Sequence, residues 1–195
     1  MEYTHIQKLA RILRVLVVIV FICNLFALLL VPGLAALSAD GGIDLVARAV
    51  LAALHQPGYE DQGMISLPLF MLLAWVGVWS ETYTVLMTVF LWICGISTAI
   101  ILWQAKRVLD SIMKAEIFCV ANAVNLRRAA VCCFVISATS LLWAICRAVL
   151  GGIFELFSLS TLFFPVFFLA ALLFLVMSAL FRQAAELKAE NDLTI

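Results

Sequence analysis

Cysteine is the most reactive residue type in this sequence, because thiols form disulfides, bind metal ions and exchange electrons. No Cys-x-x-Cys pair occurs, and the adjacent Cys132 and Cys133 would point about 100° apart on a helix. We therefore expect neither a disulfide framework nor a thiol oxidase, and we interpret Cys132 and Cys133 as small buried hydrophobic side chains. All six lie in apolar runs or in one basic segment: Cys23, Cys94, Cys119, Cys132, Cys133 and Cys146.

The residue types that bind metals or act as acid–base catalysts are scattered. His5 and His55 stand on opposite sides of the first apolar run, and no ligand set has the spacing of a zinc site. The chain also lacks a Gly-rich phosphate loop and a Gly-x-Ser-x-Gly nucleophile motif. No Asp, Glu, Lys or His lies in the middle of an apolar run, which disfavours a proton-coupled carrier. The sequence therefore predicts no catalytic residue, no metal site and no cofactor.

Two polar residues in or beside apolar runs are candidates for a functional role. Asn24 is expected to hydrogen-bond to a neighbouring helix, or else to line a solute cavity near a kink at Pro165. Arg147 is expected to extend toward the membrane edge and pair with Glu81 or Glu155, and an anion or lipid headgroup site is the alternative. A single pocket holding Glu81, Arg147 and Glu155 would instead indicate a membrane enzyme.

The elements that position these residues are long apolar runs. The chain has 195 residues, of which 66% are hydrophobic and 12% charged, and a soluble domain cannot bury so much apolar surface. Four windows of 25, 24, 18 and 26 uncharged residues are each long enough to cross a bilayer as a helix. We predict one all-α membrane domain over 1–195, with transmembrane helices at about 15–34, 83–103, 129–148 and 159–181.

Lysine and arginine predict how the chain is threaded. Only Arg48 and Arg147 fall on the outer side if both termini and the central hinge, residues 104–128, are cytoplasmic. The tail, residues 182–195, then lies inside as well. With a formal net charge of zero, the composition gives no reason to expect direct nucleic-acid binding. The cations placed inside are Lys8, Arg11, Arg14, Lys106, Arg107, Lys114, Arg127, Arg128, Arg182 and Lys188.

The outer loop, residues 38–82, is long enough to hold structure. Residues 43–54 have the spacing of a short amphipathic helix, and the apolar segment 64–80 is interrupted by Pro68. We expect 64–80 to be interfacial or re-entrant, whereas a fifth crossing there would move the C-terminus outside. The first apolar run is too long for a typical signal peptide, so it is expected to remain as the first span.

The central hinge is expected to be a folded turn. The second helix should continue to about Lys114, with Asp110 paired to Lys106 or Lys114 four residues away. Phe118 would then lie at the turn.

The third helix would begin soon after. Asn122 and Leu126 follow at steps of four on its first turns, and Arg127 and Arg128 would meet lipid phosphates. The hinge either anchors the bundle at the membrane surface or docks a cytosolic protein.

The hinge and the tail resemble two motifs of a bacterial membrane-protein family, domain of unknown function 2975. The hinge pattern is Phe-Thr-x-Glu-Asn-Val-x-Arg-Leu-Arg, and the tail ends much like Leu-x-x-Glu-Asn-Asp-Leu-Thr-Ile. Cys119, Ala121 and Asn125 depart from that pattern, where Thr, Glu and a basic residue are usual. The matching residues are Phe118, Asn122, Leu126 and Arg127, then Leu187, Glu190, Asn191, Asp192, Leu193, Thr194 and Ile195.

The resemblance also implies a functional context. Members of that family are often encoded beside a small helix-turn-helix repressor, which implies a membrane partner that regulates or sequesters it. The expectation is a non-catalytic, multi-pass protein of a bacterial inner membrane that docks a cytosolic protein. The alternative is a small transporter, or an export or immunity component, for a small molecule, lipid or peptide, and a homo-oligomer is left open. The expected docking motif comprises Phe118, Asn122, Leu126, Arg127, Arg128, Asp192, Leu193 and Thr194.

Overall fold

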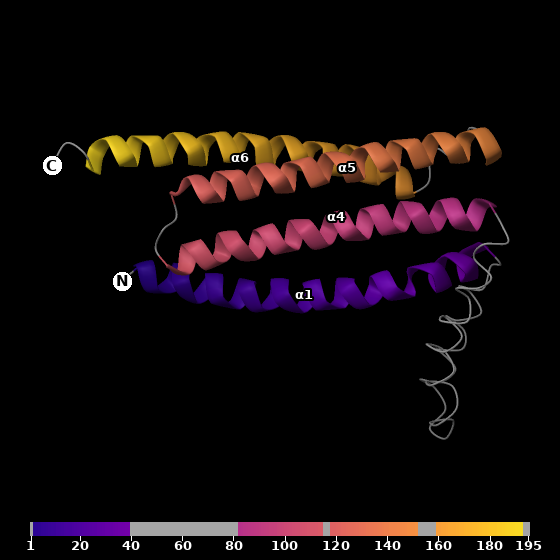
Figure 1. The fold of residues 1–195 in the computed structure, drawn as a ribbon, viewed down its shortest axis with the longest axis horizontal. Coiled ribbons are helices and arrows are strands. Elements are labelled where there is room, and N and C mark those ends of the chain that lie inside the picture. The colour runs from indigo at the N-terminus through magenta and orange to yellow at the C-terminus, as the bar shows by residue number, and fades with distance from the viewer. Residues whose placement is uncertain (1, 40–81, 115–117, 152–158, 193–195) are drawn as a thin grey trace, which may run out of the picture. The chain divides into compact units, whose positions relative to one another are not determined.

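The computed structural model describes residues 2–39, 82–114, 118–151 and 159–192, and this part of the chain is helical without any strand. It holds α1 (Glu2–Ala39), α4 (Thr82–Met113), α5 (Val120–Gly151) and α6 (Phe163–Asp192), with the short 3-10 helix η3 (Leu159–Leu162) directly before α6 (Figure 1). Each α-helix contains a stretch long and apolar enough to cross a membrane. The structure therefore confirms the predicted all-α fold, and the chain is a multi-pass membrane protein.

The helices are longer than a membrane requires. They contain 38, 32, 32 and 30 residues, whereas about 20 residues span the hydrocarbon core. Each predicted span lies inside a described helix or, for 159–181, inside η3 and α6. As predicted, α4 continues through the first part of the hinge and ends at Met113. The outer-loop predictions, the helix at 43–54 and the segment 64–80, lie outside the described residues.

The chain divides into two compact units. One comprises Met1–Leu25 and Ile93–Ile195, and the other comprises Phe26–Trp92. The boundaries fall inside α1 and α4, so each of these helices contributes to both units. The candidate site lies wholly in the first unit.

In the second unit, a tryptophan hydrogen-bonds to a carbonyl that a proline leaves without its helical donor. Pro32 lies inside α1 and has no N–H to offer to the carbonyl of Leu28, four residues earlier. The indole Nε1 of Trp92, on α4, donates to that oxygen at 3.3 Å. Since a backbone group in lipid must be satisfied within the protein, the Trp92 bond offsets the loss caused by Pro32 near the C-terminal end of this membrane helix.

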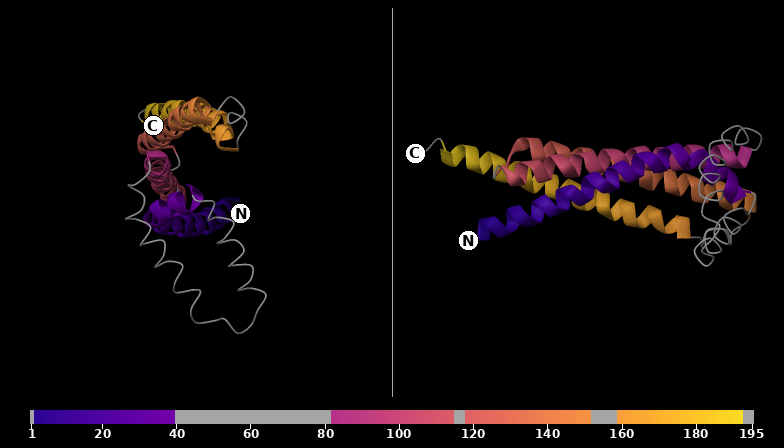
Figure 2. Two further views of the ribbon diagram at one scale, coloured as in Figure 1. Left: turned by 90° about the vertical axis from the view of Figure 1, so that its right-hand side faces the viewer. Right: turned by 90° about the horizontal axis from the view of Figure 1, so that it is seen from below.

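In the first unit, α5 and α6 pack as an antiparallel pair (Figures 1 and 2). Two serine bonds fix their register: Ser137 Oγ donates to the carbonyl of Phe164 at 3.1 Å, and Ser178 Oγ donates to that of Ala123 at 2.8 Å. Both bonds belong to one register. Ala123 and Ser137 are fourteen residues apart on α5, and their partners Ser178 and Phe164 are also fourteen residues apart on α6. Phe134 and Phe168 meet edge to face between these bonds, with centroids 5.8 Å apart.

Small residues at every seventh position explain how the two backbones approach closely enough for these bonds. Ala130 on α5 and Ala171 on α6 lie midway between the serine bonds, and both are fully buried. The same spacing continues along both helices, and α5 is the helix most enclosed by protein, with 44% of its apolar window buried against 11% for each of the others. The small residues are Ala123, Ala130, Ser137 and Ala144 on α5, and Ala171, Ser178 and Ala185 on α6.

The expected kink at Pro165 is not needed to accommodate this residue. Pro165 is the third residue of α6, the helix that follows η3 directly. The first N–H groups of a helix have no partner within that helix, so a proline there removes no hydrogen bond. Pro165 therefore helps to begin α6 instead of bending its middle.

Candidate site at the cationic end of the first unit

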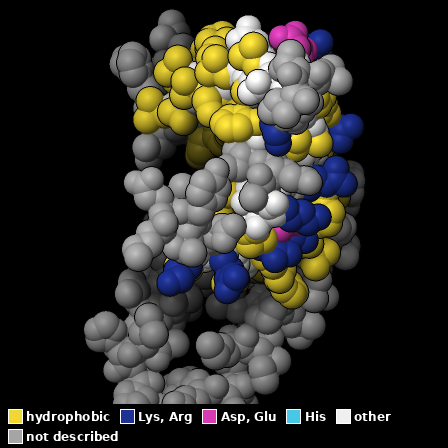
Figure 3. Space-filling view, turned by 90° about the vertical axis from the view of Figure 1, so that its left-hand side faces the viewer, with side chains coloured by type: hydrophobic (Ala, Val, Ile, Leu, Met, Phe, Trp, Pro, Cys, Tyr) yellow, Lys and Arg dark blue, Asp and Glu magenta, His cyan; other side chains and the backbone are white. Residues whose placement is uncertain are grey.

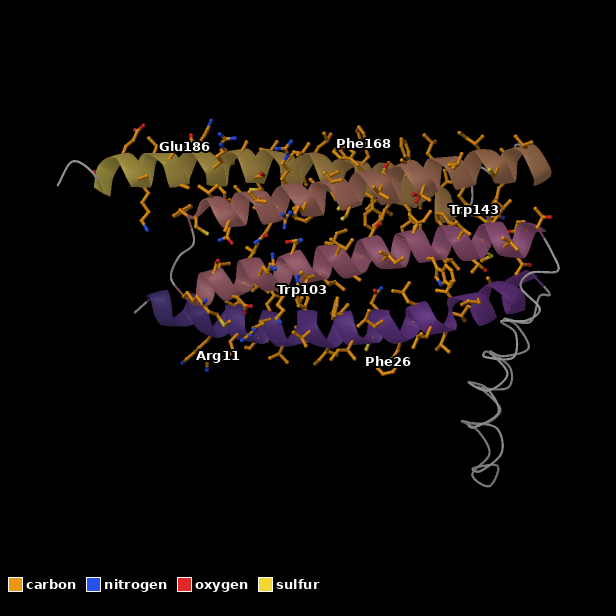
Figure 4. All side chains as sticks on the ribbon, viewed as in Figure 1. Arg11, Phe26, Trp103, Trp143, Phe168 and Glu186 are labelled. Carbon is orange, nitrogen blue, oxygen red and sulfur yellow. The ribbon has the colours of Figure 1, made fainter. Side chains whose placement is uncertain are left out.

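The most strongly charged part of the first unit is the end where α1 begins, α4 ends, α5 begins and α6 ends. Figure 3 shows Lys and Arg side chains gathered over this end, which we call the cationic end. Figure 4 shows Arg11 of α1 and Glu186 of α6 there. The cationic end carries the ten cations predicted to face one side of the membrane. Five of them that are exposed are Arg11, Arg107, Lys114, Arg127 and Arg128.

An ion pair joins α1 to α4 at this end. Arg14 Nε lies 2.8 Å from Asp110 Oδ1, with both side chains partly exposed. The sequence predicts that Asp110 pairs with Lys106 or Lys114 within the hinge, whereas the structure pairs it with Arg14. An exposed pair four residues apart on one helix stabilises by only about 0.3–0.5 kcal/mol, so a planar guanidinium from a neighbouring helix readily takes its place.

Lys106 has a different partner. Its Nζ lies 4.9 Å from the centre of the Trp103 ring, within the range of a cation–π contact. Trp103 in turn lies between α4 and α1 (Figure 4) and packs against Phe21, with ring centroids 5.8 Å apart. Below the charged groups, α1 and α4 are thus held together by aromatic packing.

The structure describes the hinge up to Lys114 and again from Phe118, and hydrogen bonds close the helix ends on both sides. Lys114 N–H donates to the carbonyls of Asp110 and Ser111, which closes the end of α4. The N–H of Asn122 donates to the carbonyl of Cys119 at 3.1 Å, so Cys119 occupies the position just before α5. Its sulfur lies 4.0 Å from Ser111 Oγ, which ties the start of α5 to the end of α4.

The structure divides the predicted docking motif between the interior and the surface. Asn122 is fully buried and Leu126 is partly buried, so these two positions belong to the interior of the unit. Phe118 is 52% exposed although its ring packs on Phe181 at 5.8 Å. Arg127 and Arg128 are exposed.

The tail part of the motif is described only at its beginning. Asp192 is the last residue of α6, while Leu193 and Thr194 lie outside the described residues.

Two hollows lie directly beneath the cationic end. One is an apolar cavity of about 240 Å³, which we call the four-helix cavity because all four helices line it, among others with Leu13, Leu109, Leu126 and Phe174. The other is a groove of about 380 Å³, the lateral groove, lined by α4 and α5 and bordered by Arg127 and Arg128.

Gln104 lines both hollows and is a residue that the sequence did not single out. Its side chain is only 6% exposed, and its Oε1 atom has no hydrogen-bond partner among the described residues. An unsatisfied buried amide oxygen costs about 1–3 kcal/mol. In the sequence, Gln104 lies in the last uncharged turn before Lys106. A polar side chain at that position indicates only the end of a membrane span.

The two isolated polar candidates lie away from this end. Asn24 is partly buried, and its Oδ1 has no hydrogen-bond partner among the described residues. Arg147 lies near the other end of α5 and is partly exposed, and its expected partners Glu81 and Glu155 lie outside the described residues. The structure therefore joins neither residue to the cationic end.

The cysteines do not form a reactive cluster. All six are free thiols, and Cys133 is buried. Across residues 2–39, 82–114, 118–151 and 159–192, no three His, Cys, Asp or Glu side chains gather closely enough to hold a metal ion. What the first unit offers chemically is a cationic surface, an apolar cavity and a groove that joins the two kinds of environment.

Comparison with known proteins identifies the family. The model of a family described as "Protein of unknown function (DUF2975)" matches residues 59–195, which is well over half of the chain. The chain belongs to DUF2975. The match includes the hinge, the cationic residues of α5 and the whole of α6, and it confirms the resemblance seen in the two motifs. Neither a curated protein nor a solved structure matches.

Proposed function

We propose that this protein is a non-catalytic membrane partner that docks an acidic surface of a cytosolic protein on its cationic end. The observation that carries the proposal is the concentration of exposed Lys and Arg side chains at one end of the first unit (Figure 3). Such a surface attracts acidic partners and speeds their encounter with the membrane. A small helix-turn-helix regulator, the kind of protein encoded beside members of the resembled family, is the partner we would test.

The turn between α4 and α5 is the best candidate for the centre of the contact. Arg107 is exposed near the end of α4, Lys114 is exposed directly after that helix, and Phe118, just before α5, is also exposed. Aromatic and arginine side chains are enriched at the core of protein interfaces. Asn122, being buried, supports this turn from within and would make a poor probe of docking.

The alternative of a small transporter depended on Asn24 and on a kink at Pro165. Because Pro165 begins α6, and because Asn24 lines neither the four-helix cavity nor the lateral groove, we do not propose it. The placement of the N-terminus, hinge and tail in the cytoplasm of a bacterium remains part of the docking proposal.

The test uses the full-length protein in nanodiscs and the purified helix-turn-helix protein. We expect saturable binding to the wild type, and at least roughly tenfold weaker binding to the double variant Arg107→Glu, Lys114→Glu, because each reversal replaces attraction by repulsion. The matched control Arg107→Lys, Lys114→Arg keeps both charges and should bind as the wild type does. Equal retention by wild-type and empty nanodiscs, or equal affinity of the two double variants, would refute the proposal.

A further inference from the structure

The lateral groove combines two cations with an apolar floor. Arg127 and Arg128 border it, and neither makes an ion pair with any described residue. The rest of its lining is largely apolar, including Ile100 of α4 and Val131 of α5. An amphiphile with a negatively charged head fits this combination, because its charge and its hydrocarbon part would each meet matching side chains.

The groove lies across the boundary between the charged and uncharged parts of both helices. On α5, Arg127 and Arg128 immediately precede the 18-residue uncharged run, and Val131 and Cys132 lie in its first turn. On α4, Gln104 lies in the last turn of the preceding uncharged run. At this depth the membrane passes from the layer of lipid phosphates to the layer of acyl chains.

Gln104 supplies an independent indication that a polar ligand group reaches this level. Its side chain is more than nine-tenths buried, and its Oε1 has no hydrogen-bond partner among the described residues although it lines the groove. Buried polar atoms are rarely left without a partner in folded proteins. A hydroxyl on the headgroup of a bound lipid would satisfy this oxygen.

We propose that the lateral groove is a specific site for one anionic phospholipid with a hydroxylated headgroup. The phosphate lies between Arg127 and Arg128, a headgroup hydroxyl donates to Gln104 Oε1, and an acyl chain runs along Ile100 and Val131. The proposal is independent of protein docking, which we place at Arg107, Lys114 and Phe118.

The experiment measures lipid binding to the purified full-length protein in detergent by native mass spectrometry. Phosphatidylglycerol is the probe, phosphatidylcholine is the zwitterionic comparison, and soluble glycerol 3-phosphate tests whether the phosphate ester alone suffices. Three changes address the site: the pair Arg127→Ala, Arg128→Ala; the buried Gln104→Leu; and Val131→Trp, which fills the groove from a position that is 54% exposed. The matched control is Arg107→Ala, Lys114→Ala, which removes the same charge from the same end.

We expect one tightly held phosphatidylglycerol, and roughly tenfold or greater weakening in the arginine pair variant, because that variant loses both cations that attract the lipid phosphate. Val131→Trp should weaken binding comparably while leaving the charge unchanged. It tests the groove even if the Gln104→Leu variant fails to fold. The control pair should bind as the wild type does. Equal loss in the control pair, equal retention of phosphatidylcholine, or full competition by glycerol 3-phosphate would each overturn a lipid-specific site.

Discussion

At the scale of single residues, the contact between Trp92 and Leu28 makes a quantitative prediction. Replacing Trp92 by Phe removes the indole N–H and leaves the Leu28 carbonyl without a donor, which should lower the free energy of unfolding by roughly 1 kcal/mol. In a Pro32→Ala background the restored backbone N–H can reach that carbonyl, so the same Trp92→Phe change should cost distinctly less. Unfolding by detergent titration measures both costs. Equal costs in the two backgrounds would show that Trp92 acts through packing alone.

The burial and the partners of several site residues could not be predicted from the sequence. The family motif predicts one docking surface that contains both Asn122 and Arg127, yet Asn122 is buried and Arg127 is exposed. A sequence motif does not distinguish a residue that supports the interior from one that contacts a partner. Arg14 and Asp110 are almost a hundred positions apart, so their ion pair depends on how α1 and α4 meet. The sequence does not identify Gln104 as a site residue, because its importance depends on the cavity and the groove that it lines in the folded protein.

At the scale of helices, the pairing of α5 and α6 predicts the effect of a larger side chain at its centre. Ala130→Leu introduces three additional carbons where two fully buried alanines meet, which should destabilise the protein by about 1–3 kcal/mol. It should also loosen the two serine bonds on either side. The matched control is Ala138→Leu, the same change on an exposed position of α5. Thermal unfolding in detergent tests this, and equal melting temperatures for the two variants would contradict the packing.

The helices themselves were largely predictable, and their pairing was only partly so. Uncharged windows marked the four spans because charges are costly in lipid and because the backbone must satisfy its own polar groups there. The seven-residue spacing of Ala123, Ala130 and Ser137 is visible in the sequence and could have indicated a close helix contact. Nothing in α5 alone says that its partner is α6, or that Pro165 begins a helix instead of bending one.

At the scale of the whole molecule, the distribution of Lys and Arg predicts an even number of crossings. A fluorescent protein fused after Ile195 should therefore be bright, because it folds in the cytoplasm, and alkaline phosphatase at the same place should be inactive. Fusions after residue 151, which follow three predicted crossings, should show the opposite pattern and serve as the control. An active phosphatase fused after Ile195 would instead support the fifth crossing at 64–80 and would require a different threading.

The enclosure of α5 has a consequence for how the protein is made. The apolar window of α5 is the least hydrophobic of the four, and much of it contacts protein in the finished structure. While the ribosome is still synthesising the next segment, Ser137 has no carbonyl of α6 to bind, and Ala130 faces a gap that lipid fills poorly. We expect α5 to remain loosely held beside the insertion machinery until α6 arrives. Biogenesis of this half of the protein would then proceed by release of a helical hairpin, with the two helices entering the lipid together.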